Sequence, residues 1–263
     1  MPSQPATARK TKRDPQQPLL GKTVLVTGAA VRVGQTIAVR LGMAGARVAV
    51  HHHESRKAAT KLVMKMHEKG IEAASFSADL SDPKGPSNLM SRVKSWAGEL
   101  DILVNSAAIF SKEPFEAVKV KTLDRLWDLN FRAPYLLSQA ALPLLKRNKG
   151  LIVNILDVAA FSAWNGYSAY CPTKAALAML TRCLAVELAP DVRVCGVAPG
   201  TVLFPDDYDA AMRSRVISSI PAGREGNPKD VAEAVLYLAT ASYVTGAVIP
   251  VDGGRLAGTR SLL

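Results

Sequence analysis

The chain of 263 residues has little cysteine, few aromatic side chains and no long apolar run. Its three cysteines, Cys171, Cys183 and Cys195, are odd in number and show no Cys-x-x-Cys spacing, so neither a disulfide framework nor a zinc site fits them. No run approaches the roughly 20 apolar residues of a membrane span, and the start of the chain has no apolar stretch of the signal-peptide kind. We therefore expect reduced thiols, no membrane partner and a cytoplasmic location.

Aromatic side chains are also too few and too scattered to support nucleic-acid binding. Only 6% of the residues are aromatic although the formal net charge is +11, and no basic run is interleaved with aromatics. We interpret the charge as a basic surface suited to an anionic cofactor and substrate, and expect no nucleic-acid partner. A nucleic-acid adaptor that uses a basic tail remains the alternative. Residues 1–18, rich in Pro, Gln, Lys and Arg, are predicted to be that disordered tail.

Short apolar segments alternate with helical segments along the rest of the chain. Strands are expected at 22–28, 46–53, 71–80, 101–107, 151–158, 192–199 and 247–252, and helices at 33–45, 54–70, 83–98, 122–147, 168–189 and 228–240. This alternation predicts one α/β domain over residues 19–263. Its core would be a doubly wound parallel sheet of about seven strands, with helices on both faces and ligands at the carboxyl ends of the strands.

The loop after the first strand, VTGAAVRVG at 26–34, has the composition of a pyrophosphate-binding loop. Backbone N–H groups must approach the ligand at a helix N-terminus, which requires residues without bulky side chains, and Gly28 and Gly34 meet that need. After the second strand, HHHESR at 51–56 has no acid at the strand end itself, which favours NADP over NAD, although Glu54 could turn toward the ribose. Side chains along a strand alternate faces, so the three histidines do not predict a metal site.

Tyr170 and Lys174 are four residues apart where a helix is expected to begin, so their side chains should share one face. A free tyrosine titrates near pH ~10, and a neighbouring positive charge stabilises the phenolate. We therefore expect Lys174 to lower the pKa of Tyr170 and make it a proton donor. Thirteen residues before Tyr170 stands a carboxylate, Asp157.

These segments, together with LVNSAA at 103–108, Asn130 in LNF and VAPG at 197–200, resemble the short-chain dehydrogenase/reductase family from about Gly21 to Gly254. The resemblance implies a Rossmann-type oxidoreductase, a substrate lid near 201–226, and a homotetramer through the helices near 122–147 and 168–189. It assigns the cofactor contacts to Gly28, Arg32, Val33, Gly34, His51, His52, His53, Ser55, Asp79, Leu80, Asn105, Ser106, Ala107, Lys174, Pro199 and Gly200.

Three departures from the usual family pattern resemble the pteridine reductases. Arg32 replaces the middle glycine of Thr-Gly-x-x-x-Gly-x-Gly, and Phe110, five positions after Asn105, is placed to sandwich a flat ring against the nicotinamide. Asp157 replaces the serine that, in ketone reductases, donates a hydrogen bond to the developing alkoxide. Two negative charges ~4 Å apart repel by about 4 kcal/mol at an effective dielectric of about 20, roughly a thousandfold in rate. Asp157 therefore either inactivates the site or serves a different acceptor.

We accordingly expect an NADPH-dependent reductase that transfers hydride to a pterin or dihydropteridine. By the same resemblance Tyr170 is the acid, Asp157 relays a proton, Asn130 supports the proton path and Lys174 also binds the nicotinamide ribose. The expected substrate contacts are Arg32, Phe110, Asp157 and Tyr170. Two alternatives remain open from the sequence: a reductase of 3-oxoacyl thioesters or other ketones, and a regulator that binds NADP without turnover.

Overall fold

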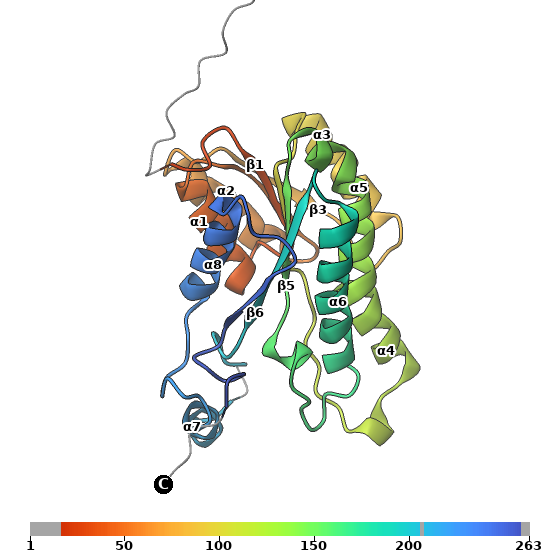
Figure 1. The fold of residues 1–263 in the computed structure, drawn as a ribbon, viewed down its shortest axis with the longest axis vertical. Helices are drawn as coiled ribbons and strands as arrows, with labels where there is room; N and C mark the ends of the chain where they lie inside the picture. The colour runs from red at the N-terminus through yellow and green to blue at the C-terminus, as the bar shows by residue number, and fades with distance from the viewer. Residues whose placement is uncertain (1–16, 206–207, 259–263) are drawn as a thin grey trace, which may run out of the picture.

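Seven parallel strands form one sheet in the order β3-β2-β1-β4-β5-β6-β7 (Figure 1). The computed structural model describes residues 17–205 and 208–258, so the expected tail lies outside the described residues except for its last two. The strands are β1 (Thr23–Val26), β2 (Arg47–His52), β3 (Ala73–Ser77), β4 (Ile102–Asn105), β5 (Leu151–Ile155), β6 (Arg193–Pro199) and β7 (Val248–Val251). The order reverses beside β1 and every neighbouring pair is parallel, which confirms the predicted Rossmann-type, doubly wound fold.

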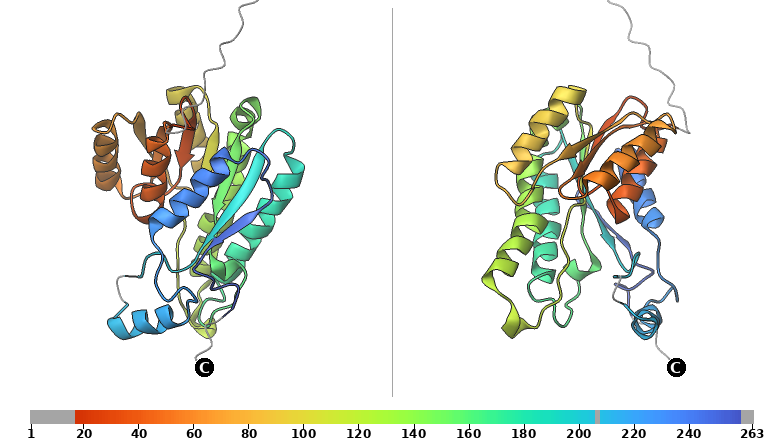
Figure 2. Two further views of the ribbon diagram at one scale, coloured as in Figure 1. Left: turned by 60° about the vertical axis from the view of Figure 1, so that its left-hand side comes forward. Right: turned by 180° about the vertical axis from the view of Figure 1, so that it is seen from behind.

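Helices cover both faces of the sheet (Figures 1 and 2). One layer consists of α1 (Arg32–Met43), α2 (Arg56–His67) and α8 (Pro228–Thr240). The other consists of α3 (Gly85–Ala97), α5 (Ala133–Arg147) and α6 (Cys171–Glu187), with α4 (Val120–Trp127) leading into α5. Helix α7 (Ala210–Ser218) lies away from both layers, near the carboxyl edge of the sheet. Within the described ranges, no helix has the length and apolarity needed to cross a membrane.

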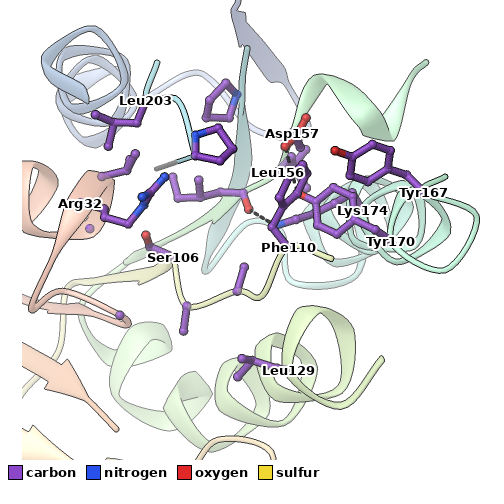
Figure 3. A pocket seen from close by; sticks show the side chains of 18 of the residues that line it. Arg32, Ser106, Phe110, Leu129, Leu156, Asp157, Tyr167, Tyr170, Lys174 and Leu203 are labelled. Atoms are coloured by element: carbon purple, nitrogen blue, oxygen red, sulfur yellow. Dashed lines mark hydrogen bonds between the residues drawn. The ribbon is translucent and has the colours of Figure 1, made fainter. Parts of the chain in front are cut away.

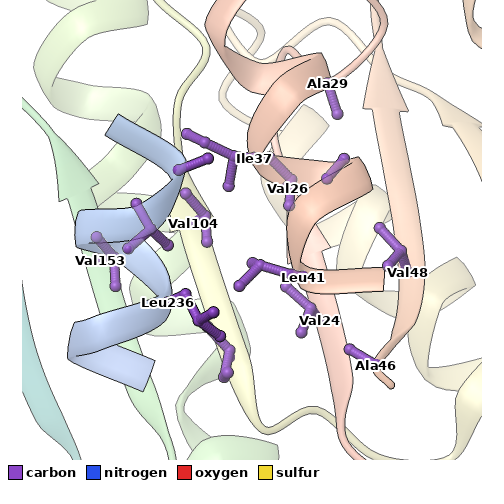
Figure 4. Packing of buried hydrophobic residues seen from close by; sticks show 14 of the residues in the cluster. Val24, Val26, Ala29, Ile37, Leu41, Ala46, Val48, Val104, Val153 and Leu236 are labelled. Carbon is purple, nitrogen blue, oxygen red and sulfur yellow. The ribbon is translucent and has the colours of Figure 1, made fainter. Parts of the chain in front are cut away.

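Strand β1 is apolar throughout because it is buried on both faces of the sheet. Val24 and Val26 join the cluster beneath α1 and α8, where Figure 4 shows them near Ile37 and Leu41. Leu25, which points the other way, packs in the cluster beneath α3 and α5. A parallel strand covered on both faces needs apolar side chains in both directions, so the alternation of a half-exposed strand is absent.

The helix expected over 122–147 is present, but a π-helical segment, Asp128–Arg132, which the sequence did not predict, lies within it between α4 and α5. The segment contains Asn130, whose side chain bonds to the backbone of a neighbouring loop. Pro134 follows in the first turn of α5, where its missing N–H removes one donor from the helical pattern. A π-helical turn of this kind widens the helix at one point and often marks a functional site.

Candidate active site

A cavity of about 1150 Å³ opens at the carboxyl edge of the sheet, lined by the loops that follow the strands and by α4 and α7 (Figure 3). Sixteen of the expected site residues line it: Gly28, Arg32, Val33, Gly34, His51, His53, Asp79, Leu80, Ser106, Ala107, Phe110, Asp157, Tyr170, Lys174, Pro199 and Gly200. The other four, His52, Ser55, Asn105 and Asn130, lie outside its lining. Residues far apart in the sequence therefore meet in one space that extends from the glycine loop to α7.

The loop after β1 is packed so closely that side chains are excluded from it. Gly28 has a φ of +62°, and a Cβ there would lie 3.0 Å from Cα of Ala107. A Cβ on Gly34 would collide with the carbonyl oxygen of Gly28. The hydroxyl of Thr27 accepts hydrogen bonds of 2.9 Å from the N–H groups of Ser106 and Ala107, which joins this loop to the one after β4. A close-packed backbone at the start of α1 fits the pyrophosphate of a dinucleotide.

His51 holds the glycine loop in place. Its Nδ1 accepts a 3.1 Å hydrogen bond from the N–H of Gly28, so the proton is on Nε2, which donates to the carbonyl of Ala78 at 3.1 Å. Burial lowers the pKa of His51 from 6.5 to about 4, and the ring therefore stays neutral near pH 7. The side chain thus supports the loop that would contact the cofactor. The sequence alone did not distinguish this supporting role from direct contact with the cofactor.

The remaining residues after β2 and β4 divide into two groups. His53 lines the cavity with 54% of its side chain exposed, and its Nε2 lies 4.0 Å from a carboxylate oxygen of Asp79. His52 is buried and bonds to the carbonyl of His53. Asn105 is buried as well, and its amide donates to Asn154 at 2.8 Å. His53 is therefore exposed in the cavity, whereas His52 and Asn105 are buried beneath it.

Asp157, Tyr170 and Lys174 converge at one end of the cavity, as expected from the sequence. The hydroxyl of Tyr170 donates a 2.9 Å hydrogen bond to Oδ2 of Asp157, and Oδ1 accepts from the N–H of Ala159 at 2.8 Å. Nζ of Lys174 donates to the carbonyl oxygen of Ile155 at 3.1 Å. Tyr170 lies immediately before the first turn of α6, which carries Lys174, so one helix end positions both groups.

Burial dominates the electrostatics of these three groups. It raises the pKa of Asp157, an effect that the Ala159 N–H, the Lys174 charge and the Tyr170 hydrogen bond only partly offset. Burial and then the charge of Asp157 raise the pKa of Tyr170 well above 10. Burial also lowers the pKa of Lys174 to about 8. The expectation that the pKa of Tyr170 is lowered is therefore wrong, because burial, and then the carboxylate bonded to the phenol, oppose its ionisation.

Asn130 acts on the site through the backbone. Its Oδ1 accepts from the N–H of Ile109 at 2.9 Å and its Nδ2 donates to the carbonyl of the same residue at 3.0 Å. Nδ2 also lies 3.2 Å from Oγ1 of Thr173, whose hydroxyl donates to the carbonyl of Tyr170 at 2.7 Å. The π-helical segment thereby fixes the loop after β4 against the start of α6.

An aromatic cluster forms the wall beside the Asp157–Tyr170 pair. The ring of Phe110 meets that of Tyr170 edge-on at 4.9 Å and that of Tyr167 at 5.0 Å with an interplanar angle of 34°. Trp164 contacts Tyr167 in turn, at 5.5 Å. Phe110 is 48% exposed, so it retains a face that a flat ligand can cover. Sequence reasoning missed Tyr167 and Trp164, although their spacing of three before Tyr170 and before each other was a usable signal.

Arg32 begins α1 with a φ of +55°, a left-handed conformation that favours glycine. Its side chain lies beside the cavity with Ser106 and Leu203 (Figure 3). At the far end of the cavity, the sequence predicted a substrate lid over 201–226 but none of the lining around α4 or after β7. That end is lined by Val120, Lys121, Asp124, Arg125 and Asp128 around α4, by Leu203, Phe204, Tyr208 and Val216 around α7, and by Arg255 after β7.

A close-packed loop for a dinucleotide, next to a buried tyrosine and lysine on one helix end, defines an NAD(P)-dependent oxidoreductase. The family model described as enoyl-(acyl carrier protein) reductase matches residues 28–255. The chain belongs to the short-chain dehydrogenase/reductase family.

Similar proteins align with nearly the whole chain. A 3-oxoacyl-[acyl-carrier-protein] reductase, FabG of Staphylococcus aureus, is 32% identical over 239 residues, which cover 89% of this chain and 97% of that protein. The short-chain dehydrogenase/reductase SDRA of Arabidopsis thaliana is 35% identical, covering 90% and 95%. Among solved structures, a blue fluorescent protein from a metagenomic library in complex with NADPH is similar with a TM-score of 0.86, 32% identity and coverage of 90% and 98%.

Proposed function

We propose that the protein uses NADPH to reduce a pterin or dihydropteridine. The observation that carries the proposal is the 2.9 Å hydrogen bond from Tyr170 to Asp157, at the position where ketone reductases have a serine. Bound NADPH supplies the hydride. The side chains described above would bind the ring, exclude water and move one proton.

The chemistry of Asp157 favours an imine-type bond over a carbonyl. An ionised carboxylate repels an oxygen that is gaining negative charge, whereas a ring nitrogen that gains a proton benefits from a neighbouring proton relay. Burial raises the pKa of Asp157, which brings its protonation closer to neutral pH. A proton can then pass between Asp157, Tyr170 and the ring nitrogen without a lasting charge in the buried site.

Two further side chains support a flat, nitrogen-rich substrate. Phe110 offers its exposed face opposite the place expected for the nicotinamide, and stacking of aromatic rings contributes about 0.5–1.5 kcal/mol beyond area burial. Arg32 brings a planar set of N–H donors to the same cavity, and such a set suits ring carbonyl and phosphate oxygens.

The preference for NADPH over NADH rests on the end of β2. No acidic residue from 51–56 lines the cavity, and Glu54, the acid that could have met the ribose hydroxyls, is absent from its lining. The exposed His53 is a donor for a 2′-phosphate. Comparing kcat/KM for NADPH and NADH with one substrate tests this preference, and a higher value for NADH contradicts it.

A second candidate, reduction of a 3-oxoacyl thioester, is favoured by the similarity to FabG. It requires Asp157 to be protonated during the reaction, so that the carboxyl group donates a hydrogen bond to the carbonyl oxygen. Burial raises the pKa of Asp157 in the direction that this requires.

NADPH oxidation by the wild-type protein and by Asp157→Asn and Asp157→Ser separates the two candidates. We expect the wild type to reduce dihydrobiopterin, and Asp157→Asn to lose about 100-fold or more in kcat because an amide cannot relay the proton. Asp157→Ser should reduce an acetoacetyl thioester better than the wild type does. Asp191→Asn, whose carboxylate is exposed before β6 and pairs with Lys149, is the matched control. Fast thioester reduction by a wild type that ignores pteridines contradicts the proposal.

We also propose that the segment 201–226 closes over the substrate and that the protein is a homotetramer. The lid is supported by Leu203, Phe204 and Val216, which line the cavity from this segment. Exposed apolar side chains on α5 and α6, such as Tyr135, Met179 and Val186, support an interface there. Light scattering after size-exclusion chromatography measures the assembly directly, and a monomer at micromolar concentration contradicts the tetramer.

A further inference from the structure

We infer that Arg255 binds a carboxylate on the substrate and makes the enzyme prefer anionic substrates over neutral ones. Arg255 lies in the turn after β7 and lines the same cavity as Asp157 and Phe110. The inference builds on the proposed function in one respect only, the placement of the reacting ring beside Phe110.

The turn that carries Arg255 is built rigidly. Oδ1 of Asp252 accepts a 2.9 Å hydrogen bond from the N–H of Gly254, and Oδ2 accepts a 2.8 Å hydrogen bond from the N–H of Leu256. The carbonyl of Gly253 accepts from the N–H of Ala222 at 2.9 Å, which attaches the turn to the segment after α7. The backbone of Arg255 is therefore fixed on both sides.

The guanidinium of Arg255 makes two contacts, and most of its N–H donors are not used by them. Its Cζ lies 5.1 Å from the centroid of the Trp164 ring, and its Nη1 donates to Oγ1 of Thr201 at 3.3 Å. No acidic side chain among the described residues comes within 4.0 Å of it. A guanidinium has five N–H donors arranged as a planar fork, so most of them remain for a ligand, and a carboxylate matches the fork.

Asp157 is not the partner of this arginine. Both of its oxygens already accept hydrogen bonds, one from Tyr170 and one from the N–H of Ala159. Arg255 acts on Asp157 only through space, where its charge lowers the pKa of the carboxyl group as the smallest of several effects. A ligand carboxylate can therefore bind Arg255 without displacing the proton-relaying pair.

The surrounding charges also favour an anion. Lys121 and Arg125 line the cavity from α4. Two acids line the cavity from that helix and the next segment. Asp128 forms a 2.9 Å ion pair with Arg132, which leaves Asp124 as the other acid against the two cations. Only Nη1 of Arg255 is hydrogen-bonded to a side chain, so the other guanidinium N–H groups can bind a ligand carboxylate through two parallel hydrogen bonds.

Steady-state kinetics of Arg255→Gln with two dihydropteridines that differ in charge tests the inference. Dihydrofolate carries carboxylates on its side chain and dihydrobiopterin carries none. We expect Arg255→Gln to raise KM for dihydrofolate by about 10- to 100-fold, because a hydrogen-bonded charge pair is lost. Its kinetics with dihydrobiopterin should change by less than about threefold. Arg92→Gln, an exposed arginine on α3 that donates to the carbonyl of Ser77 and does not line the cavity, is the control.

Results other than the selective loss with dihydrofolate either overturn the inference about Arg255 or show that the proposed pteridine reduction, and not the carboxylate site, has failed. Equal losses with both substrates mean that Arg255 acts through Asp157 or the fold, which overturns it. If the wild type reduces neither substrate, the proposed function fails, and calorimetric titration of the enzyme–NADP⁺ complex with p-aminobenzoylglutamate then tests the carboxylate site alone. Binding to the wild type that weakens about tenfold or more in Arg255→Gln supports the site. Equal binding, or none to the wild type, overturns it.

Discussion

The buried His51 makes a prediction about acid stability that can be worked out from its hydrogen bonds. In the folded protein Nδ1 accepts from Gly28 and Nε2 donates to Ala78, so a proton added to Nδ1 would face a backbone N–H with no acceptor. Burial lowers the pKa of His51 to about 4, whereas the unfolded chain titrates near 6.5. Between these values the unfolded state binds more protons, and stability therefore falls as the pH falls.

The magnitude follows from the gap between the folded and unfolded pKa values. A gap of one pH unit corresponds to about 1.4 kcal/mol, so the stability contributed by neutral His51 is fully present above about pH 6.5 and loses roughly 3 kcal/mol by about pH 4. In His51→Gln the amide oxygen can accept from Gly28 and the amide nitrogen can donate to Ala78, without a group that titrates. The variant should therefore show a correspondingly shallower loss of stability over the same pH range.

Urea unfolding at a series of pH values, at fixed protein concentration and ionic strength, measures this difference. Protein concentration must be constant because subunit association would add to the apparent stability. His53→Gln is the matched control, since His53 lies two residues further along with 54% of its side chain exposed. Parallel curves for the wild type and His51→Gln, with the same change in unfolding free energy from pH 7 to pH 4, would refute the reasoning.

Three further predictions concern the cofactor loop and the lysine. Arg32→Gly should increase the free energy of unfolding by about 1 kcal/mol in urea titrations, because glycine adopts a φ of +55° without strain, while KM for a pteridine rises. Gly34→Ala should weaken NADPH binding in fluorescence titrations, since its Cβ collides with the carbonyl of Gly28; an unchanged Kd contradicts this. Burial lowers the pKa of Lys174 to about 8, so kcat/KM should fall above that pH as the lysine loses its charge, and a profile flat to pH 10 contradicts the assignment.

The sequence predicted the sheet well because its signals are local. Most strands are short apolar runs, and each is followed within two residues by a small or polar residue that the parallel topology brings to one edge. The positions of Asp157, Tyr170, Lys174 and Phe110 around one cavity were predictable for the same reason, since all four lie just after a strand or at a helix start.

The parts that the sequence did not predict depend on contacts between distant segments. Trp164 and Arg255 are separated by ninety residues and meet only because the turns after β5 and β7 lie at the same edge of the sheet. His51 was expected to contact the cofactor, but its role in holding Gly28 depends on a tautomer set by two backbone groups. The π-helical segment between α4 and α5 likewise accompanies the bonds of Asn130 to Ile109, which no local pattern encodes.

The position of Tyr170 directly ahead of α6 has a consequence for enzyme engineering. Tyr170, Thr173 and Lys174 occupy a single helical turn, and Asn130 anchors that turn from outside. Any shift of the helix would move all these groups together and spoil their mutual alignment. Altered selectivity should therefore be sought by exchanging cavity side chains outside this turn, at Phe110 or Leu203, while the backbone of the turn is left untouched.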